Sequence, residues 1–205
     1  MCIRDRLIRE DGRESDVFSL IGPKRYDAPW REIESQGYIA PADCVEVRVD
    51  TPEPDRMVYA MAEPEDKYRL AACTPEKHRL IDEIIAHHSG EQVLVIGQYL
   101  DQLAEVSAHL DAPVITGDTS VKERERLFQS FREGEINILV VSKVANFSID
   151  LPEAAVAIQI SGTFGSRQEE AQRLGRVLRP KADGRTAHFY LSLIHISEPT
   201  RRYFI

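Results

Sequence analysis

Residues 93–110 read VLVIGQYLDQLAEVSAHL, and the pattern of this stretch changes partway along it. The run at 93–96 is apolar without interruption, which is typical of a strand buried on both faces of a sheet. After Gly97, apolar residues recur at helical spacing, at Leu100, Leu103, Val106 and Leu110. A buried strand followed directly by an amphipathic helix predicts a βα unit of a parallel sheet.

The same alternation of strand and helix patterns continues on both sides of this stretch, from about Lys77 onward. We expect one helix at 77–88 and a second that begins with a capping box, formed by Ser120 and Glu123, and ends near Gly134. Further strands are expected at 113–116, 136–141, 156–160 and 186–190. The predicted fold class is therefore α/β with a parallel sheet.

Short polar segments follow several of the predicted strands directly. In doubly wound folds, ligands bind beyond the carboxyl ends of the strands, which all meet at one edge of the sheet. We therefore expect one functional edge that gathers Gly97, Gln98, Tyr99, Gly117, Asp118, Ser142 and Lys143.

Composition narrows the class of protein. Hydrophobic residues make up 42% of the 205 residues, no apolar run reaches membrane-spanning length, and the N-terminus lacks a signal-peptide pattern, so we expect a cytoplasmic protein without a membrane partner. Three scattered cysteines and six histidines without ligand spacing predict neither a disulfide framework nor a metal site. The formal charge of -8 argues against indiscriminate binding to polyanions, although residues 122–185 carry eleven lysines or arginines against nine acids.

Residues 168–179 read QEEAQRLGRVLR and are predicted to be helical from about 167 to 179, because Ser166 and Glu169 form a capping box and Pro180 ends the helix. Ala171, Leu174 and Leu178 form an apolar stripe, and another face carries Gln172, Arg176 and Arg179. Such a face can be a solvated surface paired with acids, or it can aim fixed positive charge at phosphate.

The pattern Gln-Arg-x-Gly-Arg-x-x-Arg at 172–179 resembles motif VI of superfamily 2 helicases, and the longer run around it resembles the XPB-type DNA repair helicases, especially their bacterial branch. Two further segments occur in the order and at the spacing of that family. Residues 93–101 resemble motif IV, and residues 142–154 resemble motif V in its XPB form. The resemblance implies a RecA-like sheet sandwiched by helices, as in the second domain of these helicases.

For ATP, the resemblance implies that Arg176 and Arg179 act as arginine fingers on the γ-phosphate, with Gln172 in the same network. Asp150 matches the motif V acid that contacts the nucleotide ribose or couples the two sites, although it can equally be a helix N-cap beside Pro152. A Walker A pattern occurs nowhere in the chain. Most ligands of ATP and Mg²⁺ would then lie on a first motor domain, and the fragment alone would be inactive.

For DNA, the resemblance places strand-phosphate contacts at Gly97, Gln98, Gly117, Ser142 and Lys143. Such contacts do not read base sequence, so the expected substrate is a single strand or a fork of any sequence. Tyr99 either stacks on a base or packs at the edge. The implied activity is that of an ATP-dependent DNA helicase or translocase of 3'-to-5' polarity in DNA repair, with a repair nuclease or other repair factors as candidate partners.

The resemblance also divides the chain into parts. Residues 77–190 would be the C-terminal motor domain, and residues 16–76, which seven prolines interrupt, would be the end of the first motor domain and an irregular connector. Residues 1–6 and 192–202 look like translated sequencing-adapter reads. Residues 1–15 are therefore interpreted as a non-native or disordered start, and residues 191–205 as a non-native tail. The alternative for the tail is a terminal strand, because residues 191–196 alternate apolar and polar side chains.

Two other functions compete with the helicase hypothesis. One is a non-enzymatic RecA-like binding or regulatory domain that kept the fold and lost the motor. The other is a different superfamily 2 translocase, such as a restriction or remodelling motor, which would share motif VI but not the wording of residues 142–154.

Overall fold

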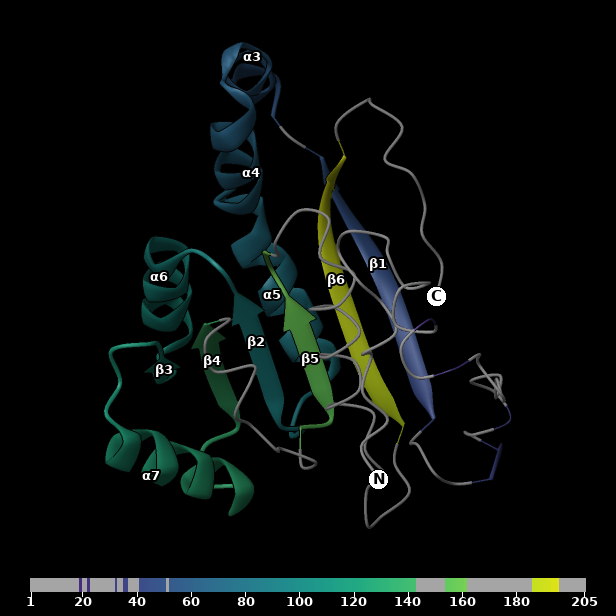
Figure 1. Cartoon of the computed structure of the whole chain (residues 1–205), viewed down its shortest axis with the longest axis vertical. Helices are drawn as coiled ribbons and strands as arrows, with labels where there is room; N and C mark the ends of the chain where they lie inside the picture. Colours follow the sequence, from purple (N-terminus) through teal and green to yellow (C-terminus); the bar gives the residue numbers. More distant parts are fainter. Residues whose placement is uncertain are drawn as a thin grey trace.

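One parallel sheet organises the protein in the computed structural model, which describes residues 19, 22, 32, 35–36, 41–50, 52–142, 154–161 and 186–195. Its six strands lie in the order β1-β6-β5-β2-β4-β3 (Figure 1). The strands are β1 (Ala42–Asp50), β2 (Val93–Gly97), β3 (Val114–Ile115), β4 (Ile138–Ser142), β5 (Val156–Gln159) and β6 (Ala187–His195). Every neighbouring pair is parallel, which confirms the predicted α/β class and brings all carboxyl ends to one edge.

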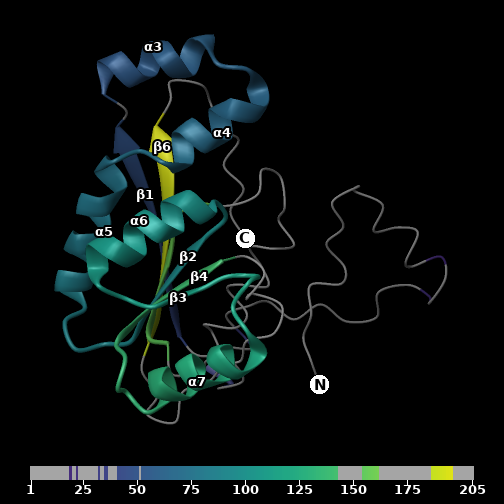
Figure 2. The same cartoon turned by 90° about the vertical axis from the view of Figure 1, so that its left-hand side faces the viewer.

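Five helices are described in these ranges: α3 (Glu53–Met61), α4 (Pro64–Ala72), α5 (Glu76–His87), α6 (Leu100–Leu110) and α7 (Val121–Arg132). Helices α5 and α6 cover one face of the sheet and α7 covers the other, as the side view shows (Figure 2). Helix α7 begins at the predicted cap, because the Ser120 hydroxyl accepts the N–H of Glu123 at 3.3 Å. The expected helix and strand positions between 77 and 160 are confirmed to within about two residues.

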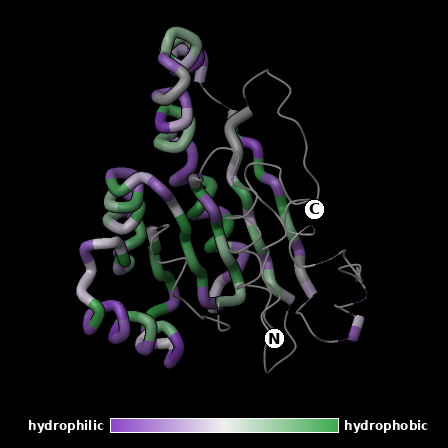
Figure 3. Tube along the Cα trace, in the orientation of Figure 1, coloured by the Kyte–Doolittle hydropathy of each residue, from purple (hydrophilic) through white to green (hydrophobic). Residues whose placement is uncertain are grey.

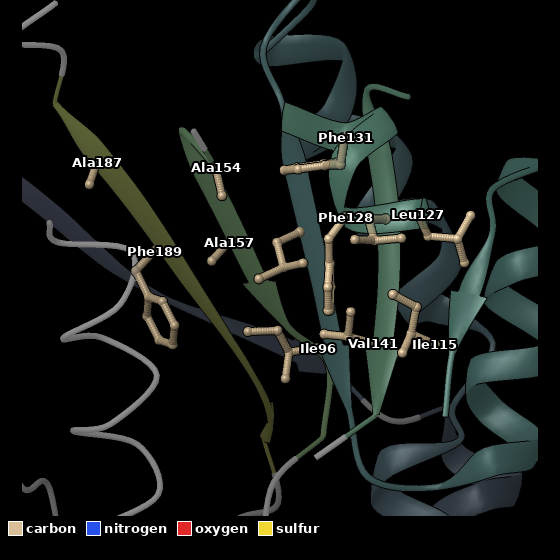
Figure 4. Packing of buried hydrophobic residues seen from close by; sticks show 12 residues of the cluster. Ile96, Ile115, Leu127, Phe128, Phe131, Val141, Ala154, Ala157, Ala187 and Phe189 are labelled. Atoms are coloured by element: carbon tan, nitrogen blue, oxygen red, sulfur yellow. The ribbon is translucent and has the colours of Figure 1, made fainter. Parts of the chain in front are cut away.

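The alternation of side chains along the strands produces two cores. On one face, Leu127, Phe128 and Phe131 of α7 pack against Ile96 of β2 and Val141 of β4 (Figure 4). On the other face, Ile81 and Ile84 of α5 and Leu103 and Val106 of α6 pack against the remaining residues of the same strands. Burial on both faces explains why the central strands are hydrophobic along most of their length (Figure 3).

The first turn of α6 departs from the predicted stripe. Leu100 is 54% exposed, whereas Gln102 is 3% exposed. Leu100 is the first residue of the helix and follows the carboxyl end of β2 by three residues. Its neighbour Gln102 turns inward because two buried hydrogen bonds satisfy its amide.

The expected connector contains more regular structure than predicted. Strand β1 pairs with β6 at the edge of the sheet, and α3 and α4 extend beyond the sheet above β2 and β6 (Figure 1). The sequence signal of β1 is an alternation of Val45, Val47 and Val49 with Glu46 and Arg48, which is typical of a half-buried edge strand. Four of the prolines flank β1 or stand at or beside the first residues of α3 and α4, where proline is compatible with a helix: Pro41, Pro52, Pro54 and Pro64.

Strand β6 continues past Tyr190, where the sequence analysis ended it. Leu191–His195 pairs with the second half of β1, from Glu46↔Leu191 to Asp50↔His195. The structure therefore contains the terminal strand that the alternating pattern offered as the alternative interpretation of residues 191–195.

Candidate functional site at the carboxyl edge of the sheet

The register of the sheet places the predicted contact residues at one edge. Gly97 is the partner of Ser142 in the pairing of β2 with β4, and both are the last residues of their strands. Gly117 follows β3 by two residues, and β3 pairs with the carboxyl half of β4. Gln98 and Tyr99 connect β2 to α6. The expectation that these segments share an edge is confirmed.

The remaining predicted site residues lie outside the described residues. They are Lys143, Asp150, Gln172, Arg176 and Arg179.

Gly97 is required by the close approach of α6. A Cβ at this position would lie 2.7 Å from Leu103 Cδ2, 3.2 Å from Ser161 Oγ and 3.3 Å from Ile160 Cγ1. Contacts under 3.0 Å force a shift of the neighbouring atoms. The missing side chain therefore lets the loop after β2 fit between the start of α6 and the end of β5.

A buried hydrogen-bond network fixes this loop. The Gln98 N–H donates to Ser161 Oγ at 2.8 Å, and the Ser161 hydroxyl donates to Gln102 Oε1 at 2.7 Å. The amide nitrogen of Gln102 in turn donates to the carbonyl of Ala72, at the end of α4. The backbone N–H of Gln98 is thus already engaged inside the protein and is not available to a phosphate.

Lys77 supports the same edge from α5. Its side chain is buried, and its ammonium donates to the carbonyl oxygen of Ile160, directly before Ser161. Burial lowers the pKa of Lys77 from 10.5 to about 8, because the charged form loses solvation. The hydrogen bond to Ile160 compensates part of that loss.

Two buried polar atoms at the carboxyl ends of strands have no hydrogen-bond partner in the described part of the chain. They are Ser142 Oγ, in a residue that is 2% exposed, and Gln159 Oε1, in a residue that is 1% exposed. Most buried polar groups are paired, so these two atoms are exceptions, and both lie at the edge where the predicted contact residues meet. Ser142 was predicted, whereas Gln159 was missed because it completes an otherwise apolar strand.

The loop that carries Gly117 is held by its own side chains. The N–H of Thr116 donates to Thr119 Oγ1 at 2.9 Å, and the N–H of Asp118 donates to Thr116 Oγ1 at 3.3 Å. Arg124 of α7 adds hydrogen bonds to the carbonyls of Thr116 and Thr119, at 3.4 and 3.2 Å. Gly117 itself is exposed and so remains accessible at the edge.

Tyr99 is partly buried at the start of α6. Burial raises the pKa of its hydroxyl, and the nearby Cys73 thiol raises it further. An ion pair between Arg69 of α4 and Asp101 of α6 lies beside it. This environment supports the packing interpretation of Tyr99, with its side chain close to the end of α4.

Metal ligands are not gathered in this region. Across the described ranges, no group of three or more His, Cys, Asp or Glu residues could hold a metal ion. None of the helices in those ranges has the length and hydrophobicity that a membrane span requires.

Comparison with known proteins identifies close relatives. The family model described as ERCC3/RAD25/XPB C-terminal helicase matches residues 33–203. A protein of Kineococcus radiotolerans named DNA 3'-5' helicase XPB is 70% identical over 184 residues, which is 90% of this chain and 33% of that protein. A protein of the same name from Mycobacterium tuberculosis is 68% identical over 184 residues, which is 90% of this chain and 34% of that protein. The chain spans about a third of the length of these curated relatives.

Solved structures share the fold at low sequence identity. The C-terminal domain of the DEAD-box protein Dbp5 has a TM-score of 0.51 at 19% identity, over 62% of this chain and 74% of that chain. The E. coli DEAD-box protein SrmB, solved with regulator of ribonuclease activity A, has a TM-score of 0.50 at 18% identity, over 58% of this chain and 70% of that chain. The sheet therefore has the RecA-like architecture of a helicase C-terminal domain.

Proposed function

The chain belongs to the ERCC3/RAD25/XPB C-terminal helicase family, and from this we propose that it is the second motor domain of an ATP-dependent 3'-to-5' DNA helicase or translocase. The observation that carries the proposal is the family match over 33–203, together with two relatives of 68–70% identity that bear the name DNA 3'-5' helicase XPB. The other superfamily 2 translocases lose support, since the match is to the XPB family model.

The carboxyl edge of the sheet is the proposed DNA contact. Gly97, Gln98, Gly117, Ser142 and Lys143 would hold the phosphates of one strand, and Tyr99 would pack beside them. The shared edge of the described residues supports this role. Contacts of this kind hold a strand without selecting its sequence.

ATP is proposed to bind between this domain and the rest of the parent protein. Arg176, Arg179 and Gln172 would face its phosphates, and Asp150 would contact the ribose or couple the two sites. When bound, Mg-ATP would supply the γ-phosphoryl group whose transfer to water drives movement along DNA. We propose that the ligands of Mg²⁺ lie outside the described residues, among which no acidic cluster could hold a metal ion.

The proposed domain division follows the same scheme. Residues 77–190 would form the motor domain, and residues 16–76 would form the connector, from which β1 joins the sheet. Sequencing the source locus on one unbroken molecule would test the assignment of 1–15 and 191–205 as non-native. The same sequence after Tyr190 in that molecule would contradict it.

The complete protein of that locus allows a direct test of the motor. DNA-stimulated ATP hydrolysis should fall about 10³-fold in Arg176→Ala and Arg179→Ala, the magnitude typical of an arginine finger. Arg167→Lys, at the start of the same predicted helix, should leave the rate unchanged. The isolated 205-residue chain should show no turnover.

Two results would contradict the proposal. One is steady ATP hydrolysis by the isolated chain. The other is a parent sequence without a P-loop and an acidic box before this domain, which would favour the non-enzymatic binding domain.

A further inference from the structure

We propose that Gln102 and Ser161 are positioning residues that lock the loop after β2 to the end of α4, so that the DNA-contacting edge moves as one body with the connector helices. The hydrogen bonds of Gln102 and Ser161 are present in the structure whatever the function of the protein, whereas their effect on DNA affinity rests on the function proposed above. Neither residue was singled out from the sequence.

The hydrogen-bonding capacity of the two side chains matches their neighbours. The Ser161 hydroxyl accepts from the Gln98 N–H and donates to Gln102 Oε1, so it acts both as an acceptor and as a donor. The Gln102 amide accepts from Ser161 and donates to the carbonyl of Ala72. Because a carbonyl can only accept, the orientation of the Gln102 amide is determined, and so is the direction of the whole chain of hydrogen bonds.

The network joins four separate parts of the fold. Ala72 ends α4, Gln102 lies in the first turn of α6, Gln98 follows β2, and Ser161 follows β5. Gln102 is 3% exposed and Ser161 is 6% exposed. Hydrogen bonds in such a buried setting are stronger than at the surface, and an unpaired member would be costly.

Packing restricts the conformation of the loop after β2. The space for a Cβ at Gly97 is filled by Leu103 and Ser161, and the ammonium of Lys77 holds the peptide that precedes Ser161. The loop can therefore shift only if the hydrogen bond between Gln98 and Ser161 breaks. While that hydrogen bond is made, the loop after β2 and the end of β5 must move together.

The second link between α4 and α6 is weaker. Arg69 and Asp101 form an ion pair, but their side chains are 61% and 46% exposed. Exposed pairs contribute little and are screened by salt. The uncharged Gln102–Ser161 network is thus the main connection, and it should be insensitive to salt.

The network also restricts how Gln98 can hold a phosphate. Its N–H is occupied by Ser161, so the contact must come from the side-chain amide. The side-chain oxygen of Gln98 is buried without a hydrogen-bond partner among the described residues, but an oxygen cannot donate to phosphate, so the contact would have to come from Nε2.

Ser161→Ala in the full 205-residue chain tests the inference. Amide hydrogen exchange, followed by NMR, should accelerate about fivefold at Gln98, as expected for the loss of one hydrogen bond. The amides of Leu94 and Ile96 in β2 should be unaffected. The affinity for a fluorescein-labelled oligo-dT strand, measured by anisotropy, should fall severalfold. Gln102→Leu leaves the Ala72 carbonyl unpaired and removes the acceptor of the Ser161 hydroxyl, but Ser161 Oγ can still accept from the Gln98 N–H. This variant should therefore lower the affinity for oligo-dT with a smaller acceleration of exchange at Gln98.

Ser107→Ala is the matched control. Ser107 lies on the same helix and donates a hydrogen bond of 2.6 Å to the carbonyl of Ala112, at the far end of α6. Its loss should cost comparable stability while leaving both Gln98 exchange and DNA affinity unchanged. A merely structural role of Ser161 would make the two variants behave alike, which would overturn the inference.

The remaining outcomes separate the inference from the proposed function. Unchanged Gln98 exchange in Ser161→Ala would show that the network does not hold the loop. Faster exchange with unchanged DNA affinity would show that the loop is held but does not serve DNA binding, and the inference would fail on that point. If the wild-type chain does not bind oligo-dT, the proposed DNA edge fails, while the exchange experiment still decides the network.

Discussion

Gly97 connects local backbone geometry to the position of the candidate site. The 2.7 Å separation between its hypothetical Cβ and Leu103 Cδ2 is too short for a real contact. Only glycine therefore allows β2, α6 and Ser161 to meet at this point. A single backbone position thus sets where the edge loop begins.

Gly97→Ala should lower the free energy of unfolding by about 1–3 kcal/mol, the usual cost of overpacking. Urea unfolding measures this loss. The clash is with one methyl group of Leu103, so the cost of Gly97→Ala should shrink in a Leu103→Ala background. An equal cost in both backgrounds would mean that another contact is responsible.

His88 is a buried histidine held by two different partners. Its Nδ1 lies 3.0 Å from Glu91 Oε2, and its Nε2 lies 2.7 Å from the hydroxyl of Tyr190. The rings of His188 and His87 lie 4.6 and 5.0 Å away, centroid to centroid. Burial lowers the pKa of His88 below its ordinary 6.5; Glu91 opposes this shift, and the two other histidines add to it.

Stability should therefore rise with pH on the acid side of neutrality. The unfolded chain binds a proton near pH 6.5 that folded His88 resists, so the contribution is complete above that pH and is lost as the pH falls toward the folded pKa. Urea unfolding between about pH 5 and pH 7.5 measures the slope. His88→Gln should flatten it.

The pairing of β1 with β6 extends the sheet into the proposed connector, residues 16–76. β1 is an edge strand, and β6 is its neighbour in the sheet. The register runs without interruption from Ala42↔Ala187 to Asp50↔His195. The second half of β1 therefore depends on residues 191–195 for its backbone hydrogen bonds.

A chain that ends after Tyr190 should keep its central sheet and lose the end of this pairing. Amide exchange should accelerate in residues 46–50, because their partner strand is missing, and it should stay slow in β2. Mass spectrometry of exchanged peptides distinguishes the two regions. Equal protection of 46–50 in both chains would mean that β6 does not extend past Tyr190 in solution.

The charge of the molecule limits how it can bind DNA. A formal charge of -8 disfavours a broad electrostatic contact, so binding should depend on a few phosphate contacts at the carboxyl edge. Such binding should be weak in the isolated chain, independent of base sequence and dependent on salt.

The salt dependence of oligo-dT binding gives the number of phosphates that the protein neutralises. For single strands, log K falls with log salt by about 0.7 per phosphate neutralised. Lys143→Ala should reduce the slope by about 0.7. Arg132→Gln should leave it unchanged, because Arg132 lies in the last turn of α7, which leads into the amino end of β4 and not its carboxyl end. Equal effects of both variants would indicate a diffuse field instead of a defined edge.

The local elements could be predicted from the sequence because their causes are local. Apolar runs predicted β2, β4 and β5, helical spacing predicted α5 and α6, and the capping box of Ser120 predicted the start of α7. The carboxyl-edge position of Gly97, Gln98, Gly117 and Ser142 followed from the rule that parallel strands end together.

The tertiary structure alone decided what depends on distant partners. Leucine spacing could not predict that Gln102, instead of Leu100, would be buried, because its partners Ala72 and Ser161 lie 30 and 59 residues away. The place of β1 at the sheet edge likewise needed β6, more than a hundred residues later in the chain. The periodicity of a sequence shows which side of a helix or strand is apolar. It does not show how buried polar groups and edge strands are paired. Each of these needs a hydrogen-bonding partner that the local sequence does not contain, so the pairing is decided only when the chain has folded.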